Sequence, residues 1–113
     1  MTTSKLDKSE WRAFFDGLDA VLGPKQAEIE TIGLAIGDQV EAEWVPLRTL
    51  TYDPKDDTID VALEGIDHRI WKPREIYIED ELEGLLKLAI IDADGIEHIL
   101  KFRDPLMLPA PHA

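Results

Sequence analysis

The chain of 113 residues has no cysteine, and it has only twelve lysines and arginines against twenty-four aspartates and glutamates. Without cysteine there are no disulfide bonds, thiolate metal sites or thiol catalysis, which fits a cytoplasmic protein. The formal net charge of −12 repels phosphate backbones and anionic lipid surfaces, so it argues against nucleic-acid binding and membrane docking. No apolar run approaches the roughly 20 residues of a membrane span, and residues 1–8 lack the apolar core of a secretory signal.

The motifs of common catalytic and cofactor sites are also missing from the sequence. It contains no P-loop, no Rossmann glycine pattern and no G-x-S-x-G elbow. Asp53, Asp56 and Asp57 offer oxygen ligands for a hard cation, but no glutamate follows at calcium-loop spacing, which favours a solvated turn. In residues 92–95 the glycine comes too early for such a loop. The sequence therefore predicts no catalytic set, no metal and no cofactor.

The first expected element is a helix over residues 7–23. Asp7 and Glu10 have the spacing of a capping box, and Leu6 and Trp11 have that of a hydrophobic staple. Gly23 and Pro24 are typical of a helix end. The apolar stripe along this helix consists of Trp11, Phe14, Phe15, Leu18 and Leu22. At this spacing the stripe is expected to cover a sheet rather than to bind a partner.

Residues 25–103 change to a period of two, which is typical of antiparallel strands with one wet face. Tyr52 is expected to face Ile59 across a turn. Leu50 is then expected to face Val61, which brings apolar residues together on one face. The expected strands are 27–32, 40–52 with a bend at Pro46, 59–63, 68–72, 87–91 and 98–102.

The last hairpin is expected to turn at Asp94-Gly95, a strong signal for a two-residue turn. Such a turn pairs Ile91 with His98 and Ala89 with Leu100. Apolar side chains then occupy both faces of the hairpin, although the helix covers only one. A curled sheet, the C-terminal tail or a second subunit would have to cover the other face, and this is the one indication of a homodimer.

The whole chain, 1–113, is expected to be a single domain that ends in a proline-rich tail over 104–113. Three prolines prevent regular structure in this tail. Residues 106–108 are too apolar for a free tail and are expected to pack on the domain or on a partner. The predicted fold class is α+β, with an N-terminal helix packed on a curved, mainly antiparallel sheet of about six strands. The alternative is a small SH3- or Sm-like barrel capped by the helix.

The candidate binding site is the segment from His68 to Arg74, which gathers basic and aromatic side chains in an acidic chain. Its candidate residues are His68, Arg69, Trp71, Lys72 and Arg74. The cations suit an anion or an acidic protein partner, and the indole offers a flat contact surface. The more ordinary interpretation is a strand whose cations neutralise nearby carboxylates. Alternation separates His68 from Arg69, so the five side chains need not converge.

Several segments together resemble an uncharacterised bacterial family, domain of unknown function 5335 (DUF5335). They are Gly37–Trp44, Tyr52–Asp57 and Pro73–Ile78, together with the opening Trp11–Phe15 and the closing Asp104–Pro109. The resemblance spans nearly the whole chain. It implies a small bacterial protein without an established activity, and it carries over no catalytic residue.

The function favoured by the sequence is therefore a non-enzymatic binding or assembly module of the bacterial cytoplasm. One alternative is a small ligand-binding protein or enzyme that uses His68 with Asp67 or with another carboxylate brought near by folding. A concave pocket around His68 would favour that alternative. A second alternative is a purely structural homodimer.

Overall fold

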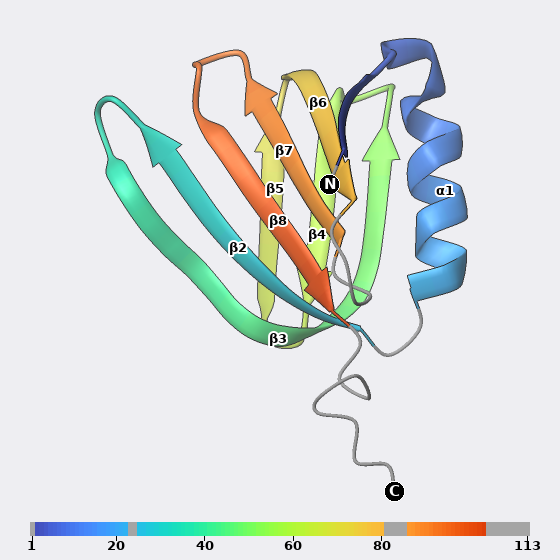
Figure 1. Ribbon diagram of the computed structural model, residues 1–113, viewed down its shortest axis with the longest axis horizontal. Coiled ribbons are helices and arrows are strands. Elements are labelled where there is room, and N and C mark those ends of the chain that lie inside the picture. Colours follow the sequence, from blue (N-terminus) through green and yellow to red (C-terminus); the bar gives the residue numbers. More distant parts are fainter. Residues whose placement is uncertain (1, 23–24, 81–85, 104–113) are drawn as a thin grey trace, which may run out of the picture.

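The protein, seen in a computed structural model, is one open antiparallel sheet with a single helix (Figure 1). The structure describes residues 2–22, 25–80 and 86–103, apart from the side chains of 2, 19–22 and 80. The strands are β1 (Thr2–Leu6), β2 (Gln26–Gly33), β3 (Gly37–Asp53), β4 (Thr58–Leu63), β5 (Ile66–Trp71), β6 (Pro73–Asp80), β7 (Leu86–Asp92) and β8 (Glu97–Arg103). The 3₁₀ turn η1 (Lys8–Glu10) leads into the helix α1 (Trp11–Leu22). The strand order is β1-β6-β7-β8-β2-β3-β4-β5.

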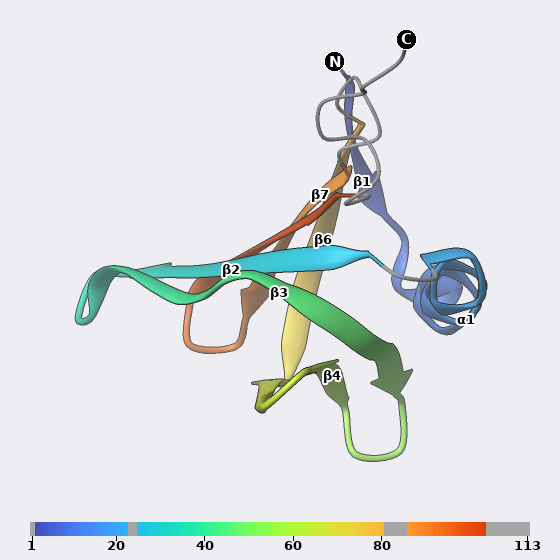
Figure 2. The same cartoon turned by 90° about the horizontal axis from the view of Figure 1, so that it is seen from below.

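The sheet curls because β3 belongs to two parts of it. The first half of β3 pairs with β2, and the second half pairs with β4. Within the half that pairs with β2, Trp44 has a φ of 52° and lies at a register shift, between Ala42 opposite Ile29 and Val45 opposite Ala27. The Leu47 N–H donates to the Lys25 carbonyl over 2.9 Å, and the Pro46 carbonyl accepts the Glu64 N–H over 2.9 Å. Figure 2 shows β3 turning from the plane of β2 toward β4.

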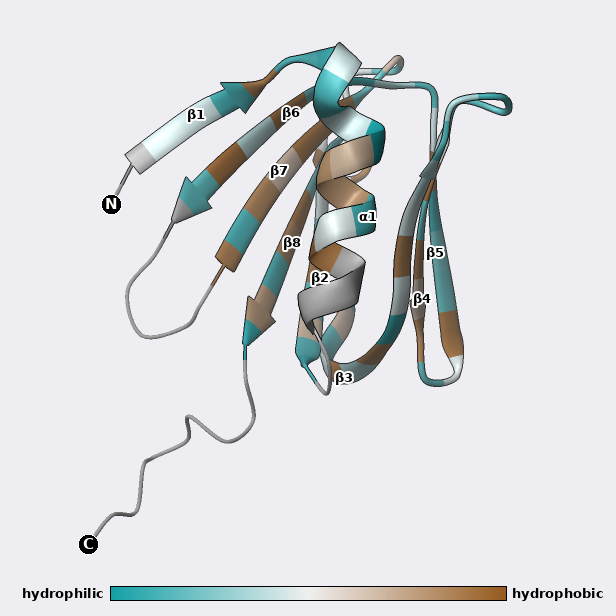
Figure 3. Cartoon of the chain, turned by 90° about the vertical axis from the view of Figure 1, so that its right-hand side faces the viewer, coloured by the Kyte–Doolittle hydropathy of each residue, from teal (hydrophilic) through white to brown (hydrophobic). Residues whose placement is uncertain are grey.

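The inner face of the curled sheet holds the core. Alternate positions of the strands are buried, as a sheet with one wet face requires. The fully buried aliphatic side chains with less than 2% exposure are Ile29, Leu50, Ile59, Val61, Ile70, Ile76, Leu88, Ile90 and Leu100. The banding by hydropathy along β6, β7 and β8 follows this alternation (Figure 3).

Helix α1 fills the open side of the curled sheet, between β1 and the second half of β3 (Figure 2). Trp11 is 1% exposed and Phe15 is 0% exposed, so both side chains belong to the core. The Trp11 ring meets the Tyr52 ring edge-on, with 5.3 Å between the centroids. Phe14 and Leu18 are partly buried, which confirms the predicted stripe as a sheet-covering face. The Leu22 side chain, Gly23 and Pro24 lie outside the described residues.

The prediction of about six strands was wrong, because two strands at one edge of the sheet were missed. Strand β1 has a single large apolar residue, Leu6, and therefore gives no period-two signal. Strand β6 begins at Pro73, and the first residue of a strand is one of the positions where proline removes no ladder hydrogen bond. The barrel alternative is wrong as well, since β1 and β5 are two unjoined edges. The helix and the mainly antiparallel sheet are confirmed, and the fold is mainly β.

The predicted register of the 53–58 hairpin is confirmed, with Tyr52 opposite Ile59 and Leu50 opposite Val61. The predicted register of the last hairpin was wrong by one residue, because Ile90, not Ile91, faces His98.

The cause of that shift is the turn of the last hairpin, which has three residues instead of two. Gly95 N–H donates to the Asp92 carbonyl over 3.0 Å, and Gly95 itself has a φ of 81°. This is a type I turn followed by a left-handed residue. The shift places Leu88 and Ile90 on the inner face together with Leu100. The outer face then carries Lys87, Ala89 and Ile91 opposite Lys101, Ile99 and Glu97, so it is a mixture of apolar and charged side chains.

Neither the predicted 104–113 tail nor its apolar residues lie within the described residues. No helix in the described ranges has the length and apolarity to cross a membrane.

Replacing Phe15 with alanine is expected to lower the free energy of unfolding by about 3–5 kcal/mol, because it leaves a cavity where the helix enters the core. Urea unfolding followed by far-ultraviolet circular dichroism measures this loss. Arg12→Ala, on the exposed face of the same helix, is the control and should stay within about 0.5 kcal/mol. Equal losses in the two variants would show that α1 is not part of the core.

Candidate functional site

The His68–Arg74 segment does not form one surface. In β5 the side chain of His68 is half-buried and that of Ile70 is fully buried, whereas Arg69 and Trp71 are exposed on the opposite face. Arg74 lies beyond the end of β5, in β6. The alternation predicted for His68, Arg69, Ile70 and Trp71 is therefore confirmed, and the five candidate residues lie at four places.

Arg69 and Trp71 form a local pair on the outer face of β5. The Arg69 guanidinium lies 5.6 Å from the centroid of the Trp71 ring, which is 59% exposed. The same guanidinium lies 3.8 Å from an Asp60 oxygen and 3.7 Å from an Asp67 oxygen. Arg69 therefore already neutralises two carboxylates of this acidic surface, as the more ordinary interpretation expects.

The carboxyl group of Asp60 holds its proton unusually tightly. Partial burial is the main cause that raises the pKa of Asp60 to about 6. A hydrogen bond to Asp67 and the charge of Asp67 also raise this pKa, whereas the charge of Arg69 lowers it. Asp60 Oδ1 is buried and has no hydrogen-bond donor among the described residues. Asp60 therefore keeps its proton in mildly acidic solution in which an ordinary aspartate is ionised.

Lys72 acts through its backbone. It has a φ of 50°, a conformation that costs a residue with a side chain about 1 kcal/mol. Its N–H donates to the Asp57 carbonyl, and its carbonyl accepts the Ala93 N–H, both over 2.9 Å. Lys72 thereby ties the 54–57 turn to the turn between β7 and β8.

Arg74 is the extra residue of a β-bulge. Pro73 pairs with Asp92 and Glu75 pairs with Ile91, so no residue of β7 lies opposite Arg74. Pro73 and Ile76 are both buried, and the two residues between them face outward. Bulges of this kind re-aim side chains. Arg74 has no ion pair among the described residues.

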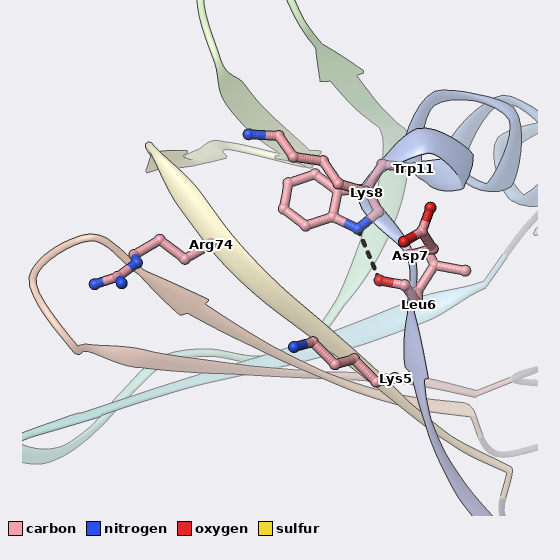
Figure 4. A pocket seen from close by; sticks show the side chains of 6 residues that line it. All are labelled: Lys5, Leu6, Asp7, Lys8, Trp11 and Arg74. Atoms are coloured by element: carbon pink, nitrogen blue, oxygen red, sulfur yellow. Dashed lines mark hydrogen bonds between the residues drawn. The ribbon is translucent and has the colours of Figure 1, made fainter.

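The re-aimed Arg74 borders a hollow of about 340 Å³ where β1 runs into η1 (Figure 4). We call it the basic hollow, and its lining residues are Lys5, Leu6, Asp7, Lys8, Trp11 and Arg74. The Trp11 Nε1–H donates to the Leu6 carbonyl over 3.2 Å, which fixes the indole edge beside the hollow. Three cationic side chains from two distant segments thus meet at one place.

The charges around the basic hollow are only partly neutralised. Lys5 Nζ lies 3.2 Å from Glu75 and Lys8 Nζ lies 4.0 Å from Asp57, and all four side chains are at least 38% exposed. Exposed pairs of this kind are weak. Asp7 caps η1, since its carboxylate accepts the Ser9 N–H over 3.3 Å and also a bond from the Ser9 hydroxyl. The side-chain bond, followed by the backbone bond, lowers the pKa of Asp7.

A second hollow of about 340 Å³ shares Lys5 and Arg74 with the first. We call it the turn hollow, and its other lining residues are Glu75, Ile91, Asp92 and Gly95. Lys5 and Arg74 therefore stand between two adjoining hollows, one beside Trp11 and one beside the β7–β8 turn.

His68 meets His98 and not Asp67, which faces the opposite side of β5. His68 Nε2 lies 3.0 Å from His98 Nδ1, and His98 Nε2 lies 2.9 Å from Asp92 Oδ2. Asp92 and His98 are each 7% exposed.

Burial is the main cause that lowers the pKa of His68, and the neighbouring His98 adds to it. The charges of Glu41 and Asp67 act in the opposite direction. Glu41 is held in place by the Thr31 hydroxyl, which donates to it over 3.0 Å. His68 therefore favours the neutral form. In the described part of the chain, no three or more His, Cys, Asp or Glu side chains are arranged to hold a metal ion.

Sequence reasoning missed Lys5 and Lys8 as site residues. They lie about seventy residues from Arg74, and only the pairing of β1 with β6 brings them near it. The early lysines of an otherwise acidic chain are the only signal that the sequence offers.

Comparison with known proteins gives a family and no function. The model described as "Family of unknown function (DUF5335)" matches residues 2–111. An "Uncharacterized protein" of Aquifex aeolicus (strain VF5) is 37% identical over 110 residues, which cover 96% of this chain and 99% of that protein. No solved structure matches the chain.

The raised pKa of Asp60 leads to a pH-dependent stability. A carboxyl group whose pKa rises from 3.8 to about 6 on folding stabilises the fold below pH 3.8, and this gain is lost as the pH rises through 6. As the pH rises from about 4 to about 7, the free energy of unfolding of the wild type should therefore fall by about 1–2 kcal/mol relative to that of Asp60→Asn, after screening by solvent is allowed for. Urea unfolding of both proteins at each pH measures the difference, with Asp56→Asn in the exposed turn as the control. Parallel profiles for all three proteins would contradict a perturbed Asp60.

Proposed function

The chain belongs to the DUF5335 family, whose function is unknown, and we propose that it is a non-enzymatic binding module of the bacterial cytoplasm. Its ligand is a small molecule with a carboxylate or phosphate group, held in the basic hollow by Arg74, Lys5 and Lys8. The proposal keeps one residue of the predicted His68–Arg74 site, Arg74, and moves the rest of the site to β1 and η1.

One observation carries the proposal. On a chain with a net charge of −12, three cations and an indole edge border a single hollow, and one of the cations has no ion pair among the described residues. Arg74 lines this hollow from a bulge in β6, and bulges are frequent beside functional sites. Single cations elsewhere on the sheet lie beside carboxylates, for example Lys87 beside Glu79 at 3.2 Å, as Lys5 and Lys8 also do. The basic hollow differs in having three cations along one lining.

The chemistry of the lining suits a small anion. A guanidinium binds carboxylate or phosphate through two parallel hydrogen bonds, and the two ammonium groups add charge without fixed geometry. A hollow of about 340 Å³ matches the low end of small-molecule sites. The negative surface around it opposes long polyanions, so a compact ligand is favoured over nucleic acid.

The lining also favours binding over catalysis. Asp7, the one carboxylate of the basic hollow, is occupied by its bonds to Ser9 at the helix start. The alternative of an enzyme that uses His68 needs Asp67 or another carboxylate nearby. Asp67 instead lies beside Arg69, and the carboxylates that folding brings near His68 are Glu41 and, through His98, Asp92. Neither hollow at Lys5 and Arg74 is lined by His68. The alternatives of a structural homodimer and of an acidic protein partner are less favoured, because the exposed apolar side chains, such as Leu34, Val40 and Trp71, carry no comparable cluster of charge.

Arg74→Ala is expected to weaken sulfate binding by about tenfold or more, because a hydrogen bond to a charged group contributes roughly 1.5–3 kcal/mol. Isothermal titration with sulfate, and in a second series with a small dicarboxylate, measures the loss at constant ionic strength. Lys5→Ala should weaken binding in the same direction.

Two matched controls remove one positive charge elsewhere. Arg48→Ala changes an exposed residue of β3, and Arg69→Ala breaks the pair with Trp71. Both are expected to bind like the wild type. No sulfate or dicarboxylate binding by the wild type, or an equal loss in Arg69→Ala, would sink the assignment of the site to the basic hollow.

A further inference from the structure

The chain Asp92–His98–His68 has its protons in fixed places. An ionised Asp92 only accepts, so His98 Nε2 carries the hydrogen of their 2.9 Å bond. Neutral His98 then has a bare Nδ1, and His68 Nε2 must carry the hydrogen that spans the remaining 3.0 Å. The ring centroids of the two histidines lie 5.2 Å apart, which is the separation of rings that point a nitrogen at each other.

This chain of bonds links three strands that are not all neighbours in the sheet. His68 belongs to the edge strand β5, His98 to β8 and Asp92 to the end of β7. Asp92 also organises the turn that follows it, because Oδ1 accepts the N–H groups of Asp94 at 2.9 Å and Ile96 at 3.0 Å. The bonds therefore run from β5, across the interior, to the β7–β8 turn.

The same turn borders the turn hollow. Asp92 and Gly95 line it together with Arg74 and Lys5. The turn is also tied to Lys72, whose carbonyl accepts the Ala93 N–H. Any loss of the bond between Asp92 and His98 would thus act on the wall of the hollow beside Arg74.

The polar residues around the two histidines come from four strands. Glu41 of β3 faces His68 and is held by Thr31 of β2, the residue that lies opposite His98 in the sheet. Asp67 is the sequence neighbour of His68 on β5, and Asp92 of β7 is bonded to His98. Each histidine therefore has carboxylates near it, but the contact between the rings holds only one hydrogen.

We propose that the Asp92–His98–His68 chain is an acid-sensitive strut that holds the β7–β8 turn in place beside Lys5 and Arg74, at the turn hollow that adjoins the proposed anion site. The inference rests on the proposed function and adds a form of regulation to the same site. One added proton is accommodated, because a protonated His98 can donate its Nδ1–H to a bare His68 Nε2, and a protonated His68 still donates its Nε2–H to His98. Protonation of both rings places two N–H groups face to face across 3.0 Å, so the contact between the rings breaks. The β7–β8 turn then loses its tie to β5.

The pH window follows from the direction in which folding changes the affinity of His68 for a proton. Burial and His98 lower the pKa of His68 below its ordinary value of 6.5. The unfolded chain then binds more protons than the folded chain just below 6.5, so the contribution of neutral His68 is complete above 6.5 and is lost as the pH falls. Asp60 acts in the opposite sense, because its raised pKa favours the fold in acid.

The first test measures the tautomers of the two histidine rings directly, without any ligand. Long-range ¹H–¹⁵N spectra of the histidine rings at about pH 7.5 should show both rings in the Nε2–H form. On acidification both rings should change together in the wild type. A His98 ring in the Nδ1–H form at about pH 7.5, or rings that titrate independently, would overturn the strut whether or not any anion binds.

The second test measures the coupling between histidine protonation and anion binding. Its probe is sulfate, which does not titrate in this pH range. His68→Gln keeps an N–H donor toward His98 but cannot take up a proton. From about pH 7.5 to about pH 5.5, the sulfate affinity of the wild type should fall about fivefold or more relative to that of His68→Gln, at the low end of typical coupling between sites.

The outcomes separate the two proposals. Sulfate binding with the same pH profile in the wild type and in His68→Gln would refute the strut and leave the proposed function intact. Absence of sulfate binding at every pH would refute the proposed function and the regulatory role, while the ring spectra would still decide whether the strut exists.

Discussion

One long strand sets the shape on which the rest of the molecule depends. Because β3 pairs with β2 along its first half and with β4 along its second, the sheet turns to face itself, and one apolar face becomes an enclosed core. The open side that remains is filled by Trp11 and Phe15 from α1. The same turn brings β5 over β8, which lets His68 reach His98. Both the core and the buried polar chain therefore follow from a bend near Pro46.

The helix and the first hairpin were predictable because their signals are local. The 3.6-residue period of the stripe from Trp11 needs only its own segment, and Asp-Pro at the turn set the pairing of Tyr52 with Ile59 correctly. The last hairpin was misread because Asp94-Gly95 serves two turn types. Here the Asp92 carboxylate stabilises the three-residue turn by accepting two N–H groups from it, and these hydrogen bonds cannot be inferred from the sequence. A register shift of one residue then moved the β7 side chains to the other face relative to those of β8.

The site was predictable only in part, since its members come from segments far apart. Composition marked Arg74 within a basic stretch, but a bulge in β6 separates it from Arg69 and directs it toward β1. Lys5 reaches the same place through the pairing of β1 with β6, and β1 has no pattern from which to infer that pairing. Likewise His68 was noticed, whereas its partner His98 could be found only once the sheet had curled. Local charge therefore indicated one residue of the site, and topology supplied the others.

The most direct test of the account is a ¹H–¹⁵N spectrum recorded during a sulfate titration at constant ionic strength. The chain has three tryptophans, and each indole N–H reports on a different place. The Trp11 indole lies at the basic hollow, the Trp71 indole lies beside Arg69, and the Trp44 ring lies 4.0 Å from the Arg103 guanidinium. The account predicts saturable shifts of the Trp11 indole and of the Lys5 and Arg74 amides, with the other two indoles unchanged. Saturable shifts at Trp71 alone, or only small shifts that do not saturate, would contradict it.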